Sequence, residues 1–230
     1  MKRGHVKTFR LLFEKQVYHY LGLAILLAIA AHATSSTGVY AGQALGCGTR
    51  FWFWLSIGIA IVHQFYVWFA WRTELHLGLM SRWFGKQAFG VWAAFFIILL
   101  VSRILSVFIL GYSNRSTWNI NPALGWGLTV LILVPAIYTF YSIEKYFTAK
   151  RALGIDHFDP AYRQLGLVRE GIYRYSSNAM YVFAAMMVWI PALVFGSKAA
   201  LISAFFNYAY LWVHYYTLEL PDMRRMYSSD

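Results

Sequence analysis

Residues 171–181 gather side chains that can do chemistry at the end of the longest polar stretch in the chain, residues 147–178. They supply aromatic faces, a fixed cation and an amide, from Tyr173, Arg174, Tyr175, Asn178 and Tyr181. A loop of this length is too long for a simple connector, and long loops are often functional. Tyrosine and arginine also serve as ordinary anchors near a membrane surface. The residue types alone therefore leave two interpretations open, a binding site and an interfacial anchor.

A second group of reactive side chains lies in the C-terminal tail. It consists of His214, Glu219 and Asp222. Two apolar blocks, residues 180–195 and 199–216, connect the two groups, and only residues 196–198 separate the blocks. This spacing predicts a tight antiparallel helical hairpin.

The composition indicates a membrane protein. Hydrophobic residues make up 60% of the 230 residues and charged residues only 13%, whereas soluble domains carry roughly a quarter charged residues. Each membrane crossing needs about 20 apolar residues. We expect about six transmembrane helices in an all-α integral membrane fold, at residues 17–33, 51–71, 91–110, 128–146, 180–195 and 199–216. The last two blocks are short, so five crossings plus a shallow segment is the alternative, and Pro135 is expected to kink the fourth helix.

The basic residues predict the orientation of these spans. The chain has 20 Lys and Arg residues and a net charge of +11. The expected outer loops hold only Arg50, Arg115 and Lys198, while nearly all other basic residues flank the inner ends of spans. The positive-inside rule then places both termini and the long loop in the cytoplasm, in a bacterial inner membrane or the endoplasmic reticulum. This distribution suits anionic headgroups and argues against nucleic acid as a partner.

Three regions follow from this pattern. Residues 1–16 place Phe9 and Phe13 at helical spacing among basic residues and predict an interfacial amphipathic segment, with a frayed basic tail as the alternative. Residues 17–146 are expected to form a four-helix membrane region. Residues 147–230 are expected to form a cytoplasmic loop, a transmembrane hairpin and a tail that together build the functional site.

The paired motifs resemble one known family. Membrane-embedded S-adenosylmethionine-dependent methyltransferases, such as phosphatidylethanolamine N-methyltransferases and isoprenylcysteine carboxyl methyltransferases, show a similar glycine, aromatic and arginine motif, then a hairpin, then an acidic motif. The resemblance covers roughly the last 85 residues and rests on Gly171, Tyr173, Arg174, Tyr175, Asn178, Tyr181 and Glu219. The chain departs from the family pattern at Ser177, where arginine is usual, and at Ala179, where proline is common.

The resemblance implies an activity and roles for these residues. It implies S-adenosylmethionine as the cofactor and a membrane-partitioned acceptor from the inner leaflet, most simply an aminophospholipid headgroup. The motif residues would bind the cofactor, with Arg174 pairing with its carboxylate. An amine acceptor must lose a proton, and Glu219, Asp222 and His214 are the candidate bases, left unranked.

Other functions stay open at this level. They are carboxyl methylation of a prenylated substrate, an NADPH-dependent membrane reductase with a distantly similar loop, and a non-catalytic relative. His63 and Arg103 lie inside spans, where ionisable residues are often functional, although Arg103 can also snorkel to the interface. Residues 156–159 carry metal-ligand types without a fourth ligand, so we interpret them as a polar loop and predict no metal site.

Overall fold

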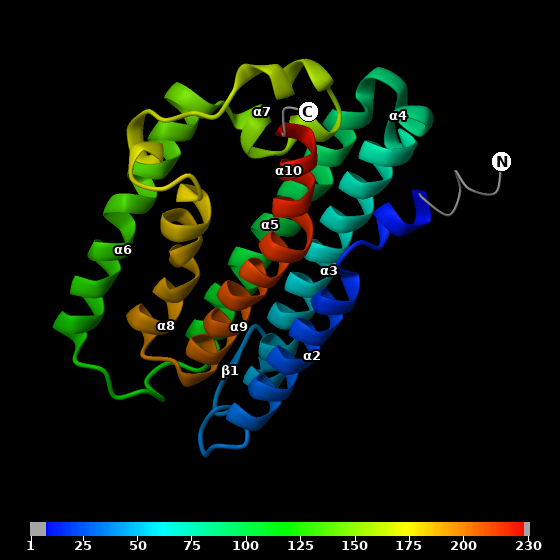
Figure 1. The fold of residues 1–230 in the computed structure, drawn as a ribbon. Coiled ribbons are helices and arrows are strands. Elements are labelled where there is room, and N and C mark those ends of the chain that lie inside the picture. The colour runs from blue at the N-terminus through cyan, green and yellow to red at the C-terminus, as the bar shows by residue number, and fades with distance from the viewer. Residues whose placement is uncertain (1–7, 228–230) are drawn as a thin grey trace.

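The computed structural model describes residues 8–227 and shows an almost entirely helical bundle (Figure 1). The long elements are α2 (Gln16–Ala33), α3 (Thr49–Leu77), α5 (Ala88–Ser113), α6 (Pro122–Ser142) and α9 (Lys198–His214). Short helices are α4 (Leu79–Phe84), α7 (Ala149–Ala152), α8 (Ile190–Phe195) and α10 (Leu220–Tyr227). The described residues contain one small antiparallel hairpin, β1 (Gln43–Ala44) with β2 (Cys47–Gly48). The predicted segment 1–16 lies partly outside the described residues; residues 8–12 of it are helical.

Four helices of the described chain are long and apolar enough to cross a membrane. They are Thr8–Ala33, Thr49–Leu77, Leu79–Ser113 and Pro122–Phe147. The apolar stretch Met180–Phe195 is shorter, and α9 has 17 residues. The structure thus bears out the helical fold class and shows four candidate membrane-spanning helices, while the number of spans and the crossing by the last two blocks stay predictions.

The fourth predicted span begins earlier than the sequence suggested. We expected it to begin at residue 128, whereas α6 begins at Pro122. Asn121 caps the helix, because its side-chain oxygen accepts hydrogen bonds from the backbone nitrogens of Ala123 and Leu124 at 2.9 and 3.3 Å. An asparagine cap followed by proline at the first helical position is a strong start signal. The cap stabilises the start of the helix more than the two glycines of its first turns destabilise it.

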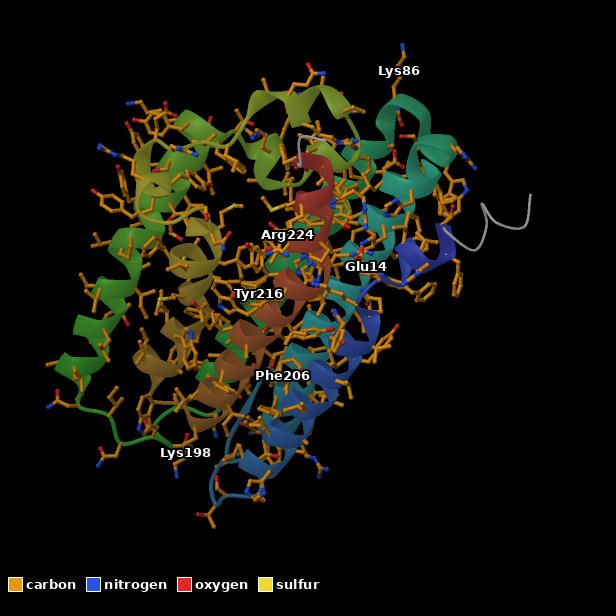
Figure 2. All side chains as sticks on the ribbon, viewed as in Figure 1. Glu14, Lys86, Lys198, Phe206, Tyr216 and Arg224 are labelled. Carbon is orange, nitrogen blue, oxygen red and sulfur yellow. The ribbon has the colours of Figure 1, made fainter. Side chains whose placement is uncertain are left out.

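Helix α9 runs through the centre of the bundle and carries much of the core. It packs against α2, α3 and α5 (Figure 1). Its buried residues include Ala200, Phe206 and Tyr210, and Phe206 is labelled on this helix in Figure 2. Glycines allow other close approaches: a Cβ on Gly111 of α5 would lie 3.0 Å from the Pro191 carbonyl oxygen of α8. Small residues at such crossings let helix backbones pack tightly.

The two ends of the bundle differ. Helices α4, α7 and α10 and the long loop lie at one end, and the β hairpin and the α8–α9 turn lie at the other (Figure 1). Lys86 and Lys198 project from these opposite ends in Figure 2. The hairpin of α8 and α9 therefore returns the tail to the loop end, as the spacing of the apolar blocks indicated.

Asn114 ties the other end together. Its side chain is 1% exposed. The amide oxygen accepts hydrogen bonds from the Ser197 hydroxyl at 3.0 Å and from the Ala199 backbone nitrogen at 2.9 Å. The amide nitrogen donates to the carbonyls of Ala41 and Gly38 at 2.8 and 3.2 Å. One side chain therefore joins the segment after α2, the end of α5 and the start of α9.

Candidate functional site

A cavity of about 170 Å³ lies inside the loop end of the bundle. Its walls come from α3, α5, the helical turn Met180–Ala184 before α8, α9, the loop before that turn and α10. Both apolar and titratable side chains line it. The titratable ones that matter below are His63, Arg103, Arg151, His214 and Glu219.

Three π-helical turns border this cavity. They are Ile143–Phe147 at the end of α6, Met180–Ala184 at the start of the hairpin and Tyr215–Glu219 at its end. Each contributes lining side chains, among them Phe147, Tyr181 and Glu219. A π-turn inserts an extra residue and re-aims the side chains around it, and such turns occur frequently at functional sites. The local distortions thus coincide with the cavity.

Tyr181 and Glu219 join the two sequence motifs directly. The Tyr181 hydroxyl donates a hydrogen bond to Glu219 Oε2 across the hairpin. Burial raises the pKa of the Glu219 carboxyl to about 7, and the hydrogen bond from Tyr181 opposes part of that rise. A carboxyl with a pKa near neutrality exists in both protonation states at working pH, which is the property of a general base or acid.

The other two candidate bases lie in different environments. His214 lines the cavity and is buried, and its Nδ1 has no hydrogen-bond partner within the described residues. Asp222 does not line the cavity. Its Oδ2 accepts a hydrogen bond from Arg72 Nε at 2.8 Å, and both side chains are fully buried. The structure therefore brings Glu219 and His214 to the cavity and places Asp222 in a buried ion pair.

This ion pair belongs to a network that fastens α10 to α3. Arg72 also donates to the backbone carbonyl of Leu11, and Glu14 lies 3.8 Å from it. Arg225 of α10 donates to the same Glu14 carboxylate at 2.8 Å. The network thus holds α10, which carries part of the cavity wall, against the first described segment.

The residues from Gly171 to Asn178 pack beside the cavity. Gly171 has φ +60°, and a Cβ there would lie 2.6 Å from the Ser142 hydroxyl oxygen, so glycine is needed at this contact. The buried ring of Tyr173 stacks on Phe147 with 5.0 Å between centroids. Asn178 donates from Nδ2 to the Tyr215 hydroxyl at 3.1 Å. These residues hold the π-turns that line the cavity.

Arg174 and Tyr175 point elsewhere. Arg174 is exposed, and the Tyr175 side chain is 77% exposed. Neither lines the cavity. Of the predicted cofactor-binding residues, Tyr181 and Glu219 are the ones that the structure brings to its wall.

Several lining residues were not predicted from the sequence. Trp71 stacks on His157 with 4.2 Å between ring centroids, and its indole nitrogen is buried with no partner in the described chain. Tyr227 donates to Asp156 Oδ2 at 2.8 Å, and Arg151 Nη2 donates to the Gly166 carbonyl at 2.5 Å. The described residues contain no cluster of three metal-ligating side chains.

A signal for the α3 wall was present. His63, Gln64, Val67 and Trp71 recur at helical spacing, which puts two polar residues of an apolar span on one side of the helix. Reading the span for polar residues that share a face would have indicated the cavity.

Comparison with known proteins finds a family model that matches the C-terminal part of the chain. A family model described as phospholipid methyltransferase matches residues 120–230. This match confirms the predicted resemblance, and it covers α6, the loop, the hairpin and α10. No curated protein and no solved structure matches the chain. The α3 and α5 walls of the cavity lie outside the matched residues.

Proposed function

Because residues 120–230 carry the pattern of the phospholipid methyltransferases, we propose that the protein methylates the amine headgroup of a membrane phospholipid with S-adenosylmethionine. The observation that carries the proposal is the hydrogen bond that joins Tyr181 to Glu219 across the cavity. It brings both halves of the family motif to one enclosed, partly polar space beside membrane helices. Charge asymmetry further supports a site at the cytoplasmic surface.

The cavity lining suits such a cofactor. S-adenosylmethionine supplies a methyl group on a sulfonium cation and carries an adenine ring and an amino acid group. Aromatic faces of Tyr181 and Trp71 are available for a cation or a ring. Buried polar atoms without partners in the described chain, Trp71 Nε1 and His214 Nδ1, can bond to polar groups of a ligand.

The small volume of the cavity suggests that the loop moves when ligands bind. Ligand sites usually measure about 300–1,000 Å³, and the present cavity is about 170 Å³. Arg151 holds the loop down through the Gly166 carbonyl, in an exposed contact that can open. We infer that opening of this contact admits the cofactor.

Glu219 is our choice for the base. The ammonium of an ethanolamine headgroup must give up a proton before its lone pair can form the new N–C bond. The Glu219 carboxylate accepts that proton, and the Tyr181 hydroxyl holds the carboxylate in place. Enclosure by the hairpin and loop excludes water, so catalysis otherwise rests on alignment.

Binding of S-adenosylhomocysteine tests the function. We expect the purified protein in detergent to bind it in calorimetry with a Kd of about 1 mM or tighter. No heat at millimolar ligand would contradict the proposal, and binding of NADPH instead would indicate the reductase alternative. Mass spectrometry of lipids from cells that express the chain then names the acceptor. Binding without any methylated product would indicate a non-catalytic relative, and a methylated carboxyl would indicate the other branch of the family.

Arg174 allows a direct test of the motif as predicted from the sequence. If this arginine pairs with the cofactor carboxylate, Arg174→Ala should weaken S-adenosylhomocysteine binding about tenfold or more. The side chain is exposed and does not line the cavity. We therefore expect the affinity for S-adenosylhomocysteine to fall less than about threefold, which is typical of a substitution on the protein surface. Calorimetry of this variant beside Lys150→Ala, an exposed cation of α7, measures the difference.

A further inference from the structure

Arg103 is a buried cation of a membrane helix. It lies on α5, is 8% exposed and lines the cavity. Its Nε donates to the Asn207 side-chain oxygen at 2.6 Å, and its Nη2 donates to the Asn207 backbone carbonyl at 2.7 Å. The sequence allowed this arginine to snorkel to the interface, but its contacts hold it inside the bundle.

Arg103 has no ion-pair partner among residues 8–227. The ion pairs of residues 8–227 involve Arg72, His157 and Arg225, and none involves Arg103. A guanidinium does not lose its proton in a protein, and a charge within a membrane segment is costly unless it is paired. The hydrogen bonds of Arg103 to Asn207 use its Nε and Nη2. The uncharged Asn207 therefore accepts some of the hydrogen bonds of the guanidinium but does not form an ion pair with it.

His63 lines the same cavity. It is 3% exposed, and its ring packs edge-on against Phe96 with 4.7 Å between centroids. Both ring nitrogens are buried without a partner in the described chain. A buried imidazole normally bonds through at least one nitrogen. A hydrogen-bond donor and an unpaired cation thus lie on the same wall, from α3 and α5, outside the residues that match the family.

We propose that Arg103 and His63 form a binding site for an anionic oxygen group, a carboxylate or a phosphodiester, of a ligand held in the cavity. The guanidinium supplies the charge and the imidazole N–H a directed donor, the combination that binds such oxygens most strongly. The anion has two candidate sources, the carboxylate of the cofactor and the phosphodiester of the acceptor lipid. The proposal rests on the proposed function only for these two candidates.

Paired ligands test the site in neutral maltoside micelles. For the cofactor, S-adenosylhomocysteine is compared with its decarboxylated analogue, S-adenosyl-3-thiopropylamine. For the lipid, phosphatidylmethanol is compared with the diacylglycerol of the same acyl chains. We expect Arg103→Gln to weaken binding of the member that carries the anionic oxygen group, in one of the two pairs, about tenfold or more. Binding of the member that lacks this group should weaken less than about threefold. The pair that responds names the source of the anion.

Matched variants separate binding from folding. Arg115→Gln removes an exposed cation just beyond the C-terminal end of α5 and should not change binding of either pair. Asn207→Ala removes the side-chain hydrogen bond from Arg103 Nε but keeps the cation and its bond to the backbone carbonyl. It should therefore lower thermal stability and keep the preference for the anion. His63→Phe should reduce that preference several-fold, and it tests the site even if Arg103→Gln fails to fold.

The outcomes are distinct from those of the function test. If the wild type binds no S-adenosylhomocysteine, the proposed function fails, while the lipid pair still tests Arg103. If Arg103→Gln and His63→Phe weaken both members of each pair equally, or neither, Arg103 serves only to join α5 and α9 and the proposal is overturned.

Discussion

Replacing Glu219 with glutamine is expected to lower the rate of methyl transfer by about 10²–10⁴-fold, the usual contribution of a general base. Glutamine keeps the size of the side chain and its acceptor for the Tyr181 hydroxyl, but it cannot take a proton from the acceptor amine. Binding of S-adenosylhomocysteine should change little. Steady-state kinetics with phosphatidylethanolamine in mixed micelles measures the effect, and Glu170→Gln, an exposed loop residue, is the control.

The pH profile sharpens this prediction. The pKa of Glu219 is about 7, and the base acts as the carboxylate. The wild-type kcat/KM should therefore rise with pH and level off above about pH 7, and the residual activity of the glutamine variant should lack this step. Full activity of the variant, or an unchanged profile, would assign proton removal to another group such as His214.

The stability of the wild-type protein should fall with rising pH, whereas its activity should rise. A folded-state pKa above the usual value means that the folded protein binds the proton more tightly than the unfolded chain. The protonated carboxyl favours folding at acidic pH, and this contribution is lost as the pH rises from 4.5 through about 7. Glutamine carries no charge at any pH. The Tm of the glutamine variant minus the Tm of the wild type should therefore be larger at pH 8 than at pH 5.

Replacing Asp222 with asparagine is expected to cost about 3–5 kcal/mol of stability, the usual loss when one partner of a buried ion pair is removed. The Arg72 guanidinium is fully buried and would keep its charge without the carboxylate. Thermal unfolding in a mild detergent should show a lowered Tm, and α10 should become susceptible to proteolysis first. Asp159→Asn is the matched control, because asparagine can replace that aspartate as a helix cap.

A second variant distinguishes this structural role from catalysis. Replacing both partners together, Arg72→Met with Asp222→Leu, removes the buried charges and should recover part of the lost stability. If Asp222 were instead the catalytic base, the double variant would be stable and inactive. We expect it to regain measurable methyl transfer along with stability.

The sequence predicted the helical fold because long apolar blocks have few alternatives in a membrane. It also predicted the return of the tail, since only three residues, Gly196 to Lys198, can form a turn between the last two blocks. Tyr181 and Glu219 were found through their motif, and the structure places both at the cavity. The orientation and the crossing of the last two helices stay predictions.

The rest of the site depends on contacts that a motif does not encode. Trp71, His157 and Arg151 come to the cavity because α3 and the loop pack together, and nothing local in the sequence requires that meeting. Asp222 and Glu219 lie three residues apart, yet one pairs with Arg72 and the other faces the cavity. Both residues were candidate bases because both carry a carboxyl group. Their different roles follow only from how α10 packs.

The hydrogen bonds of Asn114 bear on covalent modification of the chain. Asn114-Arg115-Ser116 is an acceptor pattern for N-linked sugar. A glycan would be attached to the amide nitrogen, which here donates to the Ala41 and Gly38 carbonyls from a side chain that is 1% exposed. The sugar would displace these partners and would need space that α9 and the segment after α2 occupy. Glycosylation at this site and the described fold are therefore mutually exclusive, and the folded protein should resist the modification even in a compartment where the glycosylating enzyme is present.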